Sequence, residues 1–296
     1  GNDSMDTADK LSRYAKDTGY DITIIGLPKT IDNDLPITDH TPGFGSAAKY
    51  ICASCTEAYL DVRSFDIPYL LLVETMGRNA GWLAASAALV RDHYDAPDLI
   101  YLPEVDFDID KFYGDVNKIF EKKHLAFVVI SEGIKNADGE YICERGEDLE
   151  RDKFGHKILT GSADLLGRLA KKKFGCKVRT IEIDLLQRCA GHLVSAVDIN
   201  ESFDLGKAGA KAALSGQNSV MMALTRKEGS EYSVEISSCP LSDVANIEKK
   251  IPREWINKEG NFVTQECIDY IKPLIQGEVY PPMKDGIPNY LLQKSV

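Results

Sequence analysis

One stretch of the sequence decides the fold: ITIIGL at residues 22–27, followed at once by PKTIDND at residues 28–34. The apolar run is typical of a buried strand, and carboxylates, a hydroxyl, an amide and a lysine are gathered at its carboxyl end. In an open α/β sheet, ligands bind at this end of the strands. Clusters of Asp and Asn after a strand also form plain turns, so this stretch alone leaves both interpretations open.

The same alternation of apolar runs and helical periods continues along the whole chain. Alternating strands and helices predict an α/β fold with a mainly parallel sheet that is covered on both faces. The predicted strands are Ile22–Gly26, Tyr69–Val73, Leu99–Leu102, Ala126–Ile130, Val178–Ile183, Ser219–Thr225 and Tyr232–Ile236. The predicted helices are Thr7–Lys16, Ala47–Tyr59, Gly81–Arg91, Ile109–Lys122, Asp164–Lys173 and Leu205–Ser215.

Composition restricts the function. The 296 residues carry a net charge of −11, which argues against a nucleic-acid or anionic-membrane surface as partner. No apolar run is long enough to span a bilayer and no signal peptide is visible, so we expect a cytoplasmic protein. The seven cysteines form an odd, scattered set that indicates reduced thiols. Cys52 and Cys55 have the CxxC spacing, but no second pair completes a zinc site. We interpret the two as small helix-packing residues.

Phosphoryl transfer is the chemistry that residues 28–34 suggest. It requires a base for the proton of the attacking hydroxyl and positive groups for the phosphoryl charge. Along an extended segment alternate side chains point the same way. Thr30, Asp32 and Asp34 are therefore expected to face one ligand, with Ile31 anchored inward.

Three later segments repeat the arrangement of polar residues after an apolar strand. ETMGRNAGW at residues 74–82 combines glycines, a helix start and the forked donor Arg78, which together suit phosphate. Glu132 offers two acceptor oxygens to sugar hydroxyls. Arg179 lies near the start of the fifth predicted strand and Arg188 at its end. Each of these residues could instead be a helix cap or a solvated surface charge.

Taken together and in this order, the motifs resemble those of the phosphofructokinase family. The segment TDHTPGF at residues 38–44 strengthens the similarity, and GNDS at residues 1–4 resembles the end of the family's phosphate-donor loop. The resemblance implies two Rossmann-like, three-layer lobes with fructose 6-phosphate between them. Residues 1–43 and 187–230 would form the donor-binding lobe, residues 44–186 the sugar-phosphate lobe, and residues 231–296 a C-terminal extension. The first strand and its Gly-rich loop, about 100 residues or one mononucleotide-binding half, are expected to precede Gly1. We therefore expect that the chain alone does not turn over.

The resemblance also implies roles for individual residues. Asp32 would take the proton of the sugar 1-hydroxyl, while Lys29 and Arg78 would stabilise the transferring phosphoryl group. The sugar phosphate would be positioned by Thr30, Asp34, Met76, Gly77, Glu132 and Arg188. Arg179 would reach the site of a neighbouring subunit, which implies a homo-oligomer with shared sites. The family uses Mg²⁺, but Asn2 occupies the place of its magnesium-associated aspartate, so metal binding would rest on the donor and on Asp32 or Asp3.

Asp3 and Lys29 indicate the phosphoryl donor. Pyrophosphate-dependent members of the family carry aspartate and lysine at these positions, whereas ATP-dependent members carry glycine. An aspartate places bulk and negative charge where the α-phosphate of ATP would lie. The resemblance is thus to the pyrophosphate-dependent branch, with a reversible reaction of glycolysis and gluconeogenesis. An ATP-dependent enzyme and a non-catalytic sugar-phosphate-binding regulatory subunit remain the alternatives.

Overall fold

The computed structural model describes residues 1–144, 161–229 and 231–291. Its largest sheet has four parallel strands in the order β3-β4-β2-β5, namely Leu99–Tyr101, Leu125–Ser131, Tyr69–Thr75 and Lys177–Glu182. The predicted α/β fold class and these four predicted strands are confirmed, with ends that differ by one or two residues.

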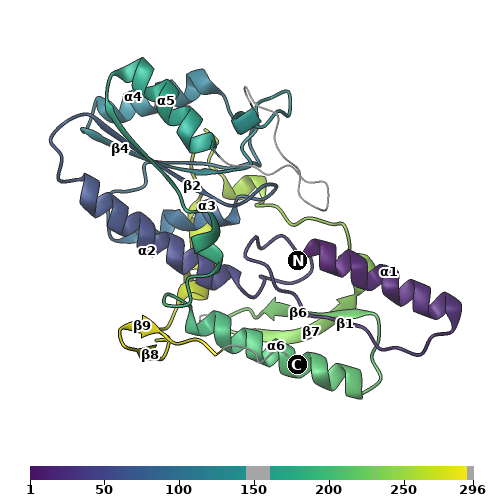
Figure 1. The fold of residues 1–296 in the computed structure, drawn as a ribbon. Helices are drawn as coiled ribbons and strands as arrows, with labels where there is room; N and C mark the ends of the chain where they lie inside the picture. The colour runs from purple at the N-terminus through teal and green to yellow at the C-terminus, as the bar shows by residue number, and fades with distance from the viewer. Residues whose placement is uncertain (145–160, 230, 292–296) are drawn as a thin grey trace.

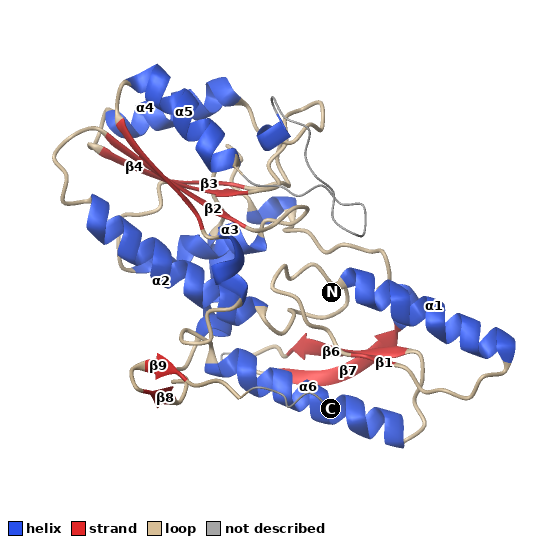
Figure 2. Cartoon of the chain, viewed as in Figure 1, coloured by secondary structure: helices blue, strands red, loops and turns tan. Residues whose placement is uncertain are grey.

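Helices cover both faces of this sheet (Figure 1, Figure 2). Along β2, Leu70 and Leu72 pack into one core cluster, and Leu71 and Val73 pack into another on the opposite face. The first cluster includes residues of α4 (Ile109–Phe120) and α5 (Ser162–Phe174), and the second includes residues of α2 (Phe44–Val62) and α3 (Trp82–Ser86). Burial on both faces explains why β2 is apolar without alternation.

A smaller sheet joins β1 (Ile25–Gly26), β6 (Val220–Arg226) and β7 (Val234–Pro240), with β1 and β6 parallel and β6 and β7 antiparallel. Helices α1 (Asn2–Thr18) and α6 (Ala196–Leu214) pack on its opposite faces, through Met5 against Met221 and Leu205 against Met222. The predicted strand Ile22–Gly26 is shorter than expected. The Asn218 side chain accepts the N–H of Ile24 and donates to the carbonyl oxygen of Ile22, so these backbone groups do not pair with a neighbouring strand.

The start of the chain also differs from the expectation. The sequence predicts a turn at residues 1–4 and a helix from Thr7, but α1 already begins at Asn2, with Gly1 as its N-cap. The backbone N–H groups of Ser4 and Met5 both donate to the Gly1 carbonyl oxygen (3.2 Å each). Asn2 and Asp3 therefore lie in the first helical turn, where an acidic residue is favoured by the helix dipole.

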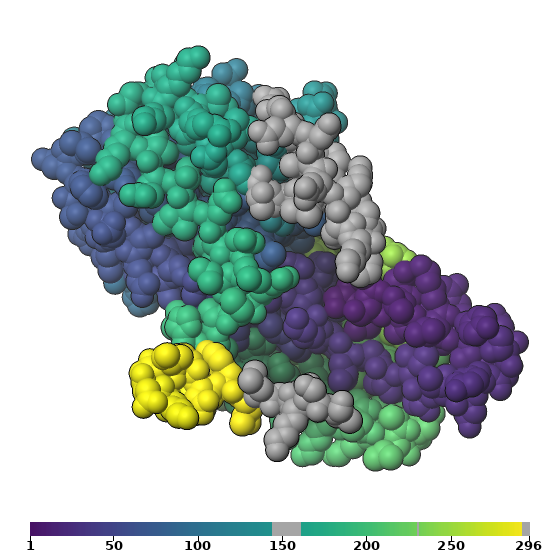
Figure 3. All heavy atoms as spheres, in the orientation of Figure 1, coloured from purple at the N-terminus to yellow at the C-terminus, as the bar shows by residue number. Residues whose placement is uncertain are grey.

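Residues after β7 contribute to both parts of the fold. Val244 packs beside α1, whereas α7 (Gln265–Ile271) enters the core around α2 and α3. The hairpin of β8 (Met283–Lys284) and β9 (Ile287–Pro288) projects at the surface, where it is drawn in yellow (Figure 3). The division of the chain into lobes at residues 43, 186 and 230 stays a prediction.

Short 3₁₀ segments complete the described chain: Ala87–Asp92, Ile142–Glu144, Asp184–Arg188, Leu241–Asp243, Arg253–Trp255 and Lys272–Ile275. Within the described residues, no helix has the length and apolar content needed to cross a membrane.

Candidate functional site

The loop that carries Asp32 is a compact turn, so the expected extended geometry is wrong. Thr30 bridges Gly43, and Asn33 then adopts a left-handed backbone with φ of 53°. The Thr30 hydroxyl donates to Oδ2 of Asp32 (3.0 Å) and accepts the Asp32 N–H (3.2 Å). The turn still brings Thr30 and Asp32 together. Ile31 packs against the core as expected, but Asn33 is the fully buried residue of the loop.

Asp34 follows in the same turn, and its carboxyl group lies where burial disfavours a negative charge. One of its oxygens, Oδ1, is buried and has no hydrogen-bond partner among the described residues. Burial, and secondly the charge of Asp32, raise the pKa of Asp34 to about 6. The Asp32 carboxylate is therefore close enough to disfavour ionisation of Asp34.

Gly77 and Gly133 let two strand-end loops approach one another. Gly77 follows β2 with φ of 137°, and its N–H donates to Oε1 of Glu132 (3.3 Å), just after β4. A Cβ on Gly133 would overlap the carbonyl oxygen of Arg78, so only glycine permits this approach. The Met76 N–H donates to the side-chain oxygen of Gln187 (3.2 Å). Met76, Gly77 and Glu132 are thus brought together as the sequence predicts.

Glu132 lies within electrostatic reach of both Asp32 and Arg78. Burial raises the pKa of Glu132 to about 7, the Asp32 charge adds to the rise, and the Arg78 guanidinium opposes it. The Nε of Arg78 is buried without a partner in the part of the chain that the structure describes. Glu74, at the end of β2, has a pKa raised to about 7, also mainly by burial. Carboxyl groups with such values can exchange protons near neutrality.

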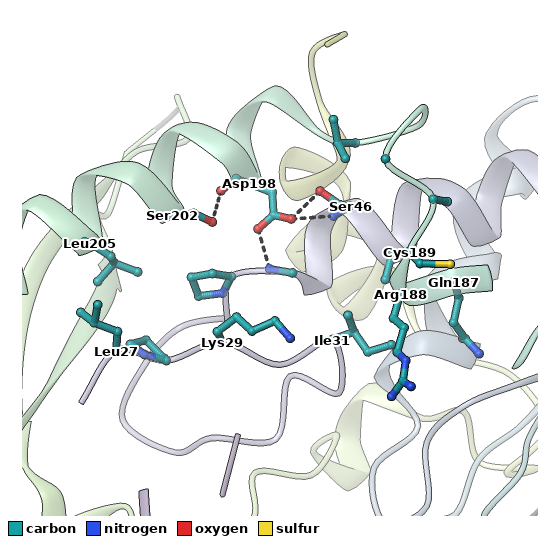
Figure 4. A pocket seen from close by; sticks show the side chains of 18 residues that line it. Leu27, Lys29, Ile31, Ser46, Gln187, Arg188, Cys189, Asp198, Ser202 and Leu205 are labelled. Atoms are coloured by element: carbon teal, nitrogen blue, oxygen red, sulfur yellow. Dashed lines mark hydrogen bonds between the residues drawn. The ribbon is translucent and has the colours of Figure 1, made fainter. Parts of the chain in front are cut away.

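A pocket of about 480 Å³ opens beside this turn, and Lys29, Ile31 and Arg188 are among the residues that line it. Figure 4 shows the Ile31 side chain between those of the two cations. Arg188 lies at the end of a 3₁₀ segment that begins two residues after β5, so its predicted place at the strand end is wrong. An extra turn after the strand carries it to the pocket. The positively charged side chains of Lys29 and Arg188 thus line one pocket, which suits an anionic substrate.

The pocket wall also contains Asp198, at the start of α6. Its Oδ1 accepts the N–H of Gly43 (2.8 Å), and its Oδ2 accepts the N–H (3.0 Å) and the hydroxyl (2.5 Å) of Ser46 (Figure 4). Asp198 therefore caps the first turn of α2 from a neighbouring element and fixes the position of the loop that ends at Gly43.

Arg179 is not brought to this site. It is an exposed residue in the middle of β5, opposite Leu71 of β2, and β5 is an edge strand of its sheet. At about 3.3 Å per residue, it lies about 10 Å before the strand end at Glu182. Within one chain it is thus remote from the pocket that Arg188 lines.

Asn2 and Asp3 lie near the site, but the Asn2 side chain is hydrogen-bonded to a later segment whereas Asp3 is exposed. The Gly1 nitrogen donates to the Lys29 carbonyl oxygen (3.0 Å), which places the start of α1 beside the Asp32 turn. The Asn2 amide accepts from the Asn246 N–H (2.9 Å) and donates to the Ile247 carbonyl oxygen (3.2 Å). Asn2 is therefore engaged in holding a later segment, and its part in metal binding stays a prediction.

The carboxyl groups at the turn fit a divalent cation only in part. Within residues 1–144, 161–229 and 231–291, no group of three His, Cys, Asp or Glu residues is arranged to hold a metal ion. Mg²⁺ commonly binds through one or two carboxylates together with substrate phosphates. Asp32, and Asp34 with its unpaired Oδ1, fit that limited share of a coordination shell.

Sequence reasoning missed several residues of the site: Gln187, Asp198, Glu248 and Lys249. Gln187 stands next to the predicted Arg188, and its burial gives the signal in retrospect. Asp198 opens a helix and resembles an ordinary cap residue. Glu248 accepts from the Asn79 side chain (2.6 Å), but it lies in a part of the sequence with no recognisable motif.

The predicted structural role of Cys52 and Cys55 is confirmed. Both thiols lie on α2, where Cys55 is fully buried and Cys52 donates to the Ser86 carbonyl oxygen (3.2 Å). Burial raises the pKa of Cys52 to about 12 and that of Cys55 further still. Thiols that remain protonated are poor nucleophiles and metal ligands.

Comparison with known proteins gives consistent matches. The phosphofructokinase family model matches residues 1–190. The chain is 42% identical over 294 residues to a pyrophosphate–fructose 6-phosphate 1-phosphotransferase from Methylococcus capsulatus, covering 98% of this chain and 69% of the relative. It is 43% identical over 302 residues to an enzyme of the same name from Xanthomonas campestris pv. campestris, covering 100% and 71%. A solved pyrophosphate-dependent phosphofructokinase from Nitrosospira multiformis superposes with a TM-score of 0.88 at 38% identity, covering 100% of this chain and 72% of that one.

Proposed function

Because the chain belongs to the phosphofructokinase family, we propose that it transfers a phosphoryl group from pyrophosphate to the 1-hydroxyl of fructose 6-phosphate. One observation supports this most directly. Thr30 is hydrogen-bonded to Asp32, Glu132 lies within electrostatic reach of both Asp32 and Arg78, and a pocket with Lys29 and Arg188 on its wall lies beside the turn. A base, a sugar-binding carboxyl group and three cations are what this transfer requires.

In the proposed reaction, Asp32 accepts the proton of the 1-hydroxyl as its oxygen bonds to the terminal phosphorus of pyrophosphate. The bond from that phosphorus to the bridging oxygen breaks, and orthophosphate leaves with the electron pair and later receives the proton. Thr30 holds Asp32 by its hydroxyl, and Arg78 and Lys29 offset the phosphoryl charge. Glu132, Asp34, Met76 and Gly77 hold the sugar, and Arg188 its 6-phosphate. Mg²⁺ bound by pyrophosphate and Asp32 would neutralise part of the donor's charge.

Donor choice is proposed to rest on Asp3 and Lys29. The two are brought near one another because the Gly1 nitrogen, at the start of α1, donates to the Lys29 carbonyl oxygen. A carboxylate at the start of α1 repels a longer polyphosphate, while the lysine attracts the compact, highly charged pyrophosphate. The N–H groups of the first turn of α1 favour an anion at this place.

Arg179 is proposed to act across a subunit interface. It is exposed on the edge strand β5 and remote from the pocket of its own chain, so its role in sugar-phosphate binding requires a second copy. This proposal expects a homo-oligomer by light scattering, and an Arg179→Ala variant that assembles but binds fructose 6-phosphate weakly.

A coupled assay on the complete protein, with pyrophosphate and ATP side by side, tests the proposed reaction. We expect turnover with pyrophosphate, and a loss of at least 100-fold in kcat for Asp32→Asn, since a positioned base contributes about 10²–10⁴-fold. Calorimetry should show fructose 6-phosphate binding to Asp32→Asn within about threefold of the wild-type affinity. Turnover with ATP alone would contradict the proposed donor, and binding without turnover by the complete protein would favour the regulatory-subunit alternative. Asp66→Asn, at an exposed position, is the matched control.

Donor selection has its own test. Lys29→Gly combined with Asp3→Gly should lower kcat/KM for pyrophosphate at least tenfold. An unchanged value would show that these two residues do not choose the donor.

A further inference from the structure

The segment Asn246–Lys249, which lies between β7 and α7, contacts three separate loops of the proposed site. In Figure 1 the yellow-green chain after β7 leads from the smaller sheet toward the larger one. Asn246 and Ile247 hold the Asn2 side chain at the start of α1. Glu248 accepts from Asn79 in the loop after β2 (2.6 Å), and Lys249 contacts the loop of residues 30–39.

The Lys249 ammonium group has its partners inside this last loop. Nζ donates to the carbonyl oxygens of Asp39 (2.7 Å) and Thr38 (3.2 Å) and to Oδ1 of the buried Asn33 (3.3 Å). These three bonds use all the donors of an ammonium group. Nζ also lies 5.5 Å from the centre of the Trp82 ring, a cation–π distance.

The backbone of Lys249 connects the same two regions. Its N–H donates to the Asp34 carbonyl oxygen (2.7 Å), and its carbonyl oxygen accepts from Nε1 of Trp82 (3.1 Å). Trp82 is the first residue of α3, four residues after Arg78. One residue thus fixes the turn that carries the proposed base on one side and the loop that carries Arg78 on the other.

We propose that Lys249 is a positioning residue, which holds the Asp32 turn at its working distance from Arg78 and Glu132. This inference rests on the proposed function. Asn33 is the link, because its Oδ1 accepts from Lys249 and from the Thr41 N–H (3.1 Å), while its backbone has the left-handed conformation that separates Asp32 from Asp34. A displacement of about 1 Å in such a site is sufficient to cost 10²-fold in rate.

A purely structural role predicts a different result for the same substitution. Lys249→Met removes the donor of three hydrogen bonds and should lower the melting temperature in either case. If Lys249 only stabilised the fold, the folded variant would keep its kcat and KM well below its melting temperature. If Lys249 positions the turn, kcat falls at that temperature although the variant is folded.

The Arg226 guanidinium lies in the same region, where it is bound to Oδ2 of Asp39 (2.9 Å). An arginine at position 249 would keep the positive charge and can supply donors to the same acceptors.

The test compares Lys249→Met, Lys249→Arg and the matched control Lys250→Met, an adjacent exposed lysine. We expect Lys249→Met to lower kcat/KM at least tenfold, mainly through kcat, when it is assayed well below its melting temperature. Lys249→Arg should recover to within about threefold of wild type. Lys250→Met should match wild type. A kcat/KM of folded Lys249→Met within twofold of wild type overturns the proposal, as does a loss that arginine does not rescue.

Hydrogen–deuterium exchange separates this inference from the proposed function. Lys249→Met should raise amide exchange at least tenfold in residues 30–39 and 76–82, and Lys250→Met should not. If the wild-type protein shows no turnover, the proposed function fails, but the exchange result still decides the positioning role. Unchanged exchange in both loops of Lys249→Met overturns the inference even in an active enzyme.

Discussion

Asp34 offers the sharpest test of how the proposed site is built, because its substitution should make the protein more stable. Its carboxyl group is largely buried, and one oxygen has no partner in the described part of the chain. Burial and the Asp32 charge raise its pKa from 3.8 to about 6. One pKa unit corresponds to 1.36 kcal/mol, so ionisation of Asp34 in the folded protein costs about 3 kcal/mol relative to the unfolded chain.

The sign of the pH dependence follows from the raised pKa. Below about pH 4, Asp34 is neutral in both states and contributes no penalty to the free energy of unfolding. As the pH rises from about 4 to about 6, the unfolded chain releases the proton first, so stability decreases. Above that range the full penalty persists. Asp34→Asn has nearly the same shape and no charge, so it should be more stable than wild type by about 2–3 kcal/mol at pH 8 and about equal at pH 3.5.

Urea unfolding followed by the fluorescence of Trp82 and Trp255 measures this difference. Asp66→Asn is the control, since the Asp66 side chain is 97% exposed and surface substitutions usually change stability by less than about 0.5 kcal/mol. The reasoning is refuted if Asp34→Asn is less stable than wild type at pH 8, or if the difference is the same at both pH values. The stabilised variant should also bind fructose 6-phosphate more weakly, a trade of stability for function.

Two further predictions concern the pocket. Cys189 is the exposed cysteine on the pocket wall, so a maleimide should label it before the other thiols. Pyrophosphate or fructose 6-phosphate should slow this labelling at least threefold, as measured by peptide mass spectrometry. Equal labelling rates with and without ligand would show that the ligands bind elsewhere. Asp198→Ala removes the acceptor of three hydrogen bonds from Gly43 and Ser46. It should lower the free energy of unfolding in urea by about 2–4 kcal/mol, because it leaves buried donors unpaired, and Asp198→Asn should lower it less. A change below about 0.5 kcal/mol for the alanine variant would contradict the capping role.

The sequence predicts the strands of the larger sheet well because each buried strand is a continuous run of apolar residues. Leu70, Leu72 and Val128 belong to unbroken apolar runs, and such runs need no alternation when both sheet faces are covered. Residues 22–24 belong to a similar apolar run but do not extend β1, because the Asn218 side chain is hydrogen-bonded to their backbone groups. A partner 194 residues away in the sequence leaves no local trace.

The predicted site divides in the same way. Thr30, Asp32, Gly77 and Glu132 lie at strand ends, and parallel topology brings such ends together. Asn2 occupies the place of the family's magnesium-associated aspartate, and its amide is engaged by residues 246 and 247. Lys249 belongs to an exposed-looking pair of lysines, and nothing in the pair tells which ammonium group is buried. Its bond to Asn33 spans 216 residues, so only the folded chain reveals it.

Three carboxyl groups in this region, those of Asp34, Glu74 and Glu132, share one physical feature, which is a pKa brought near neutrality mainly by burial. Asp34 stands at about 6, and Glu74 and Glu132 at about 7. In a chain with net charge −11, fully ionised carboxylates near a phosphate site would repel the substrate. A partly protonated set weakens that repulsion and still offers hydrogen bonds to sugar hydroxyls. Their ionisation is unfavourable for folding, so these positions lower stability in exchange for a site that an anion can enter.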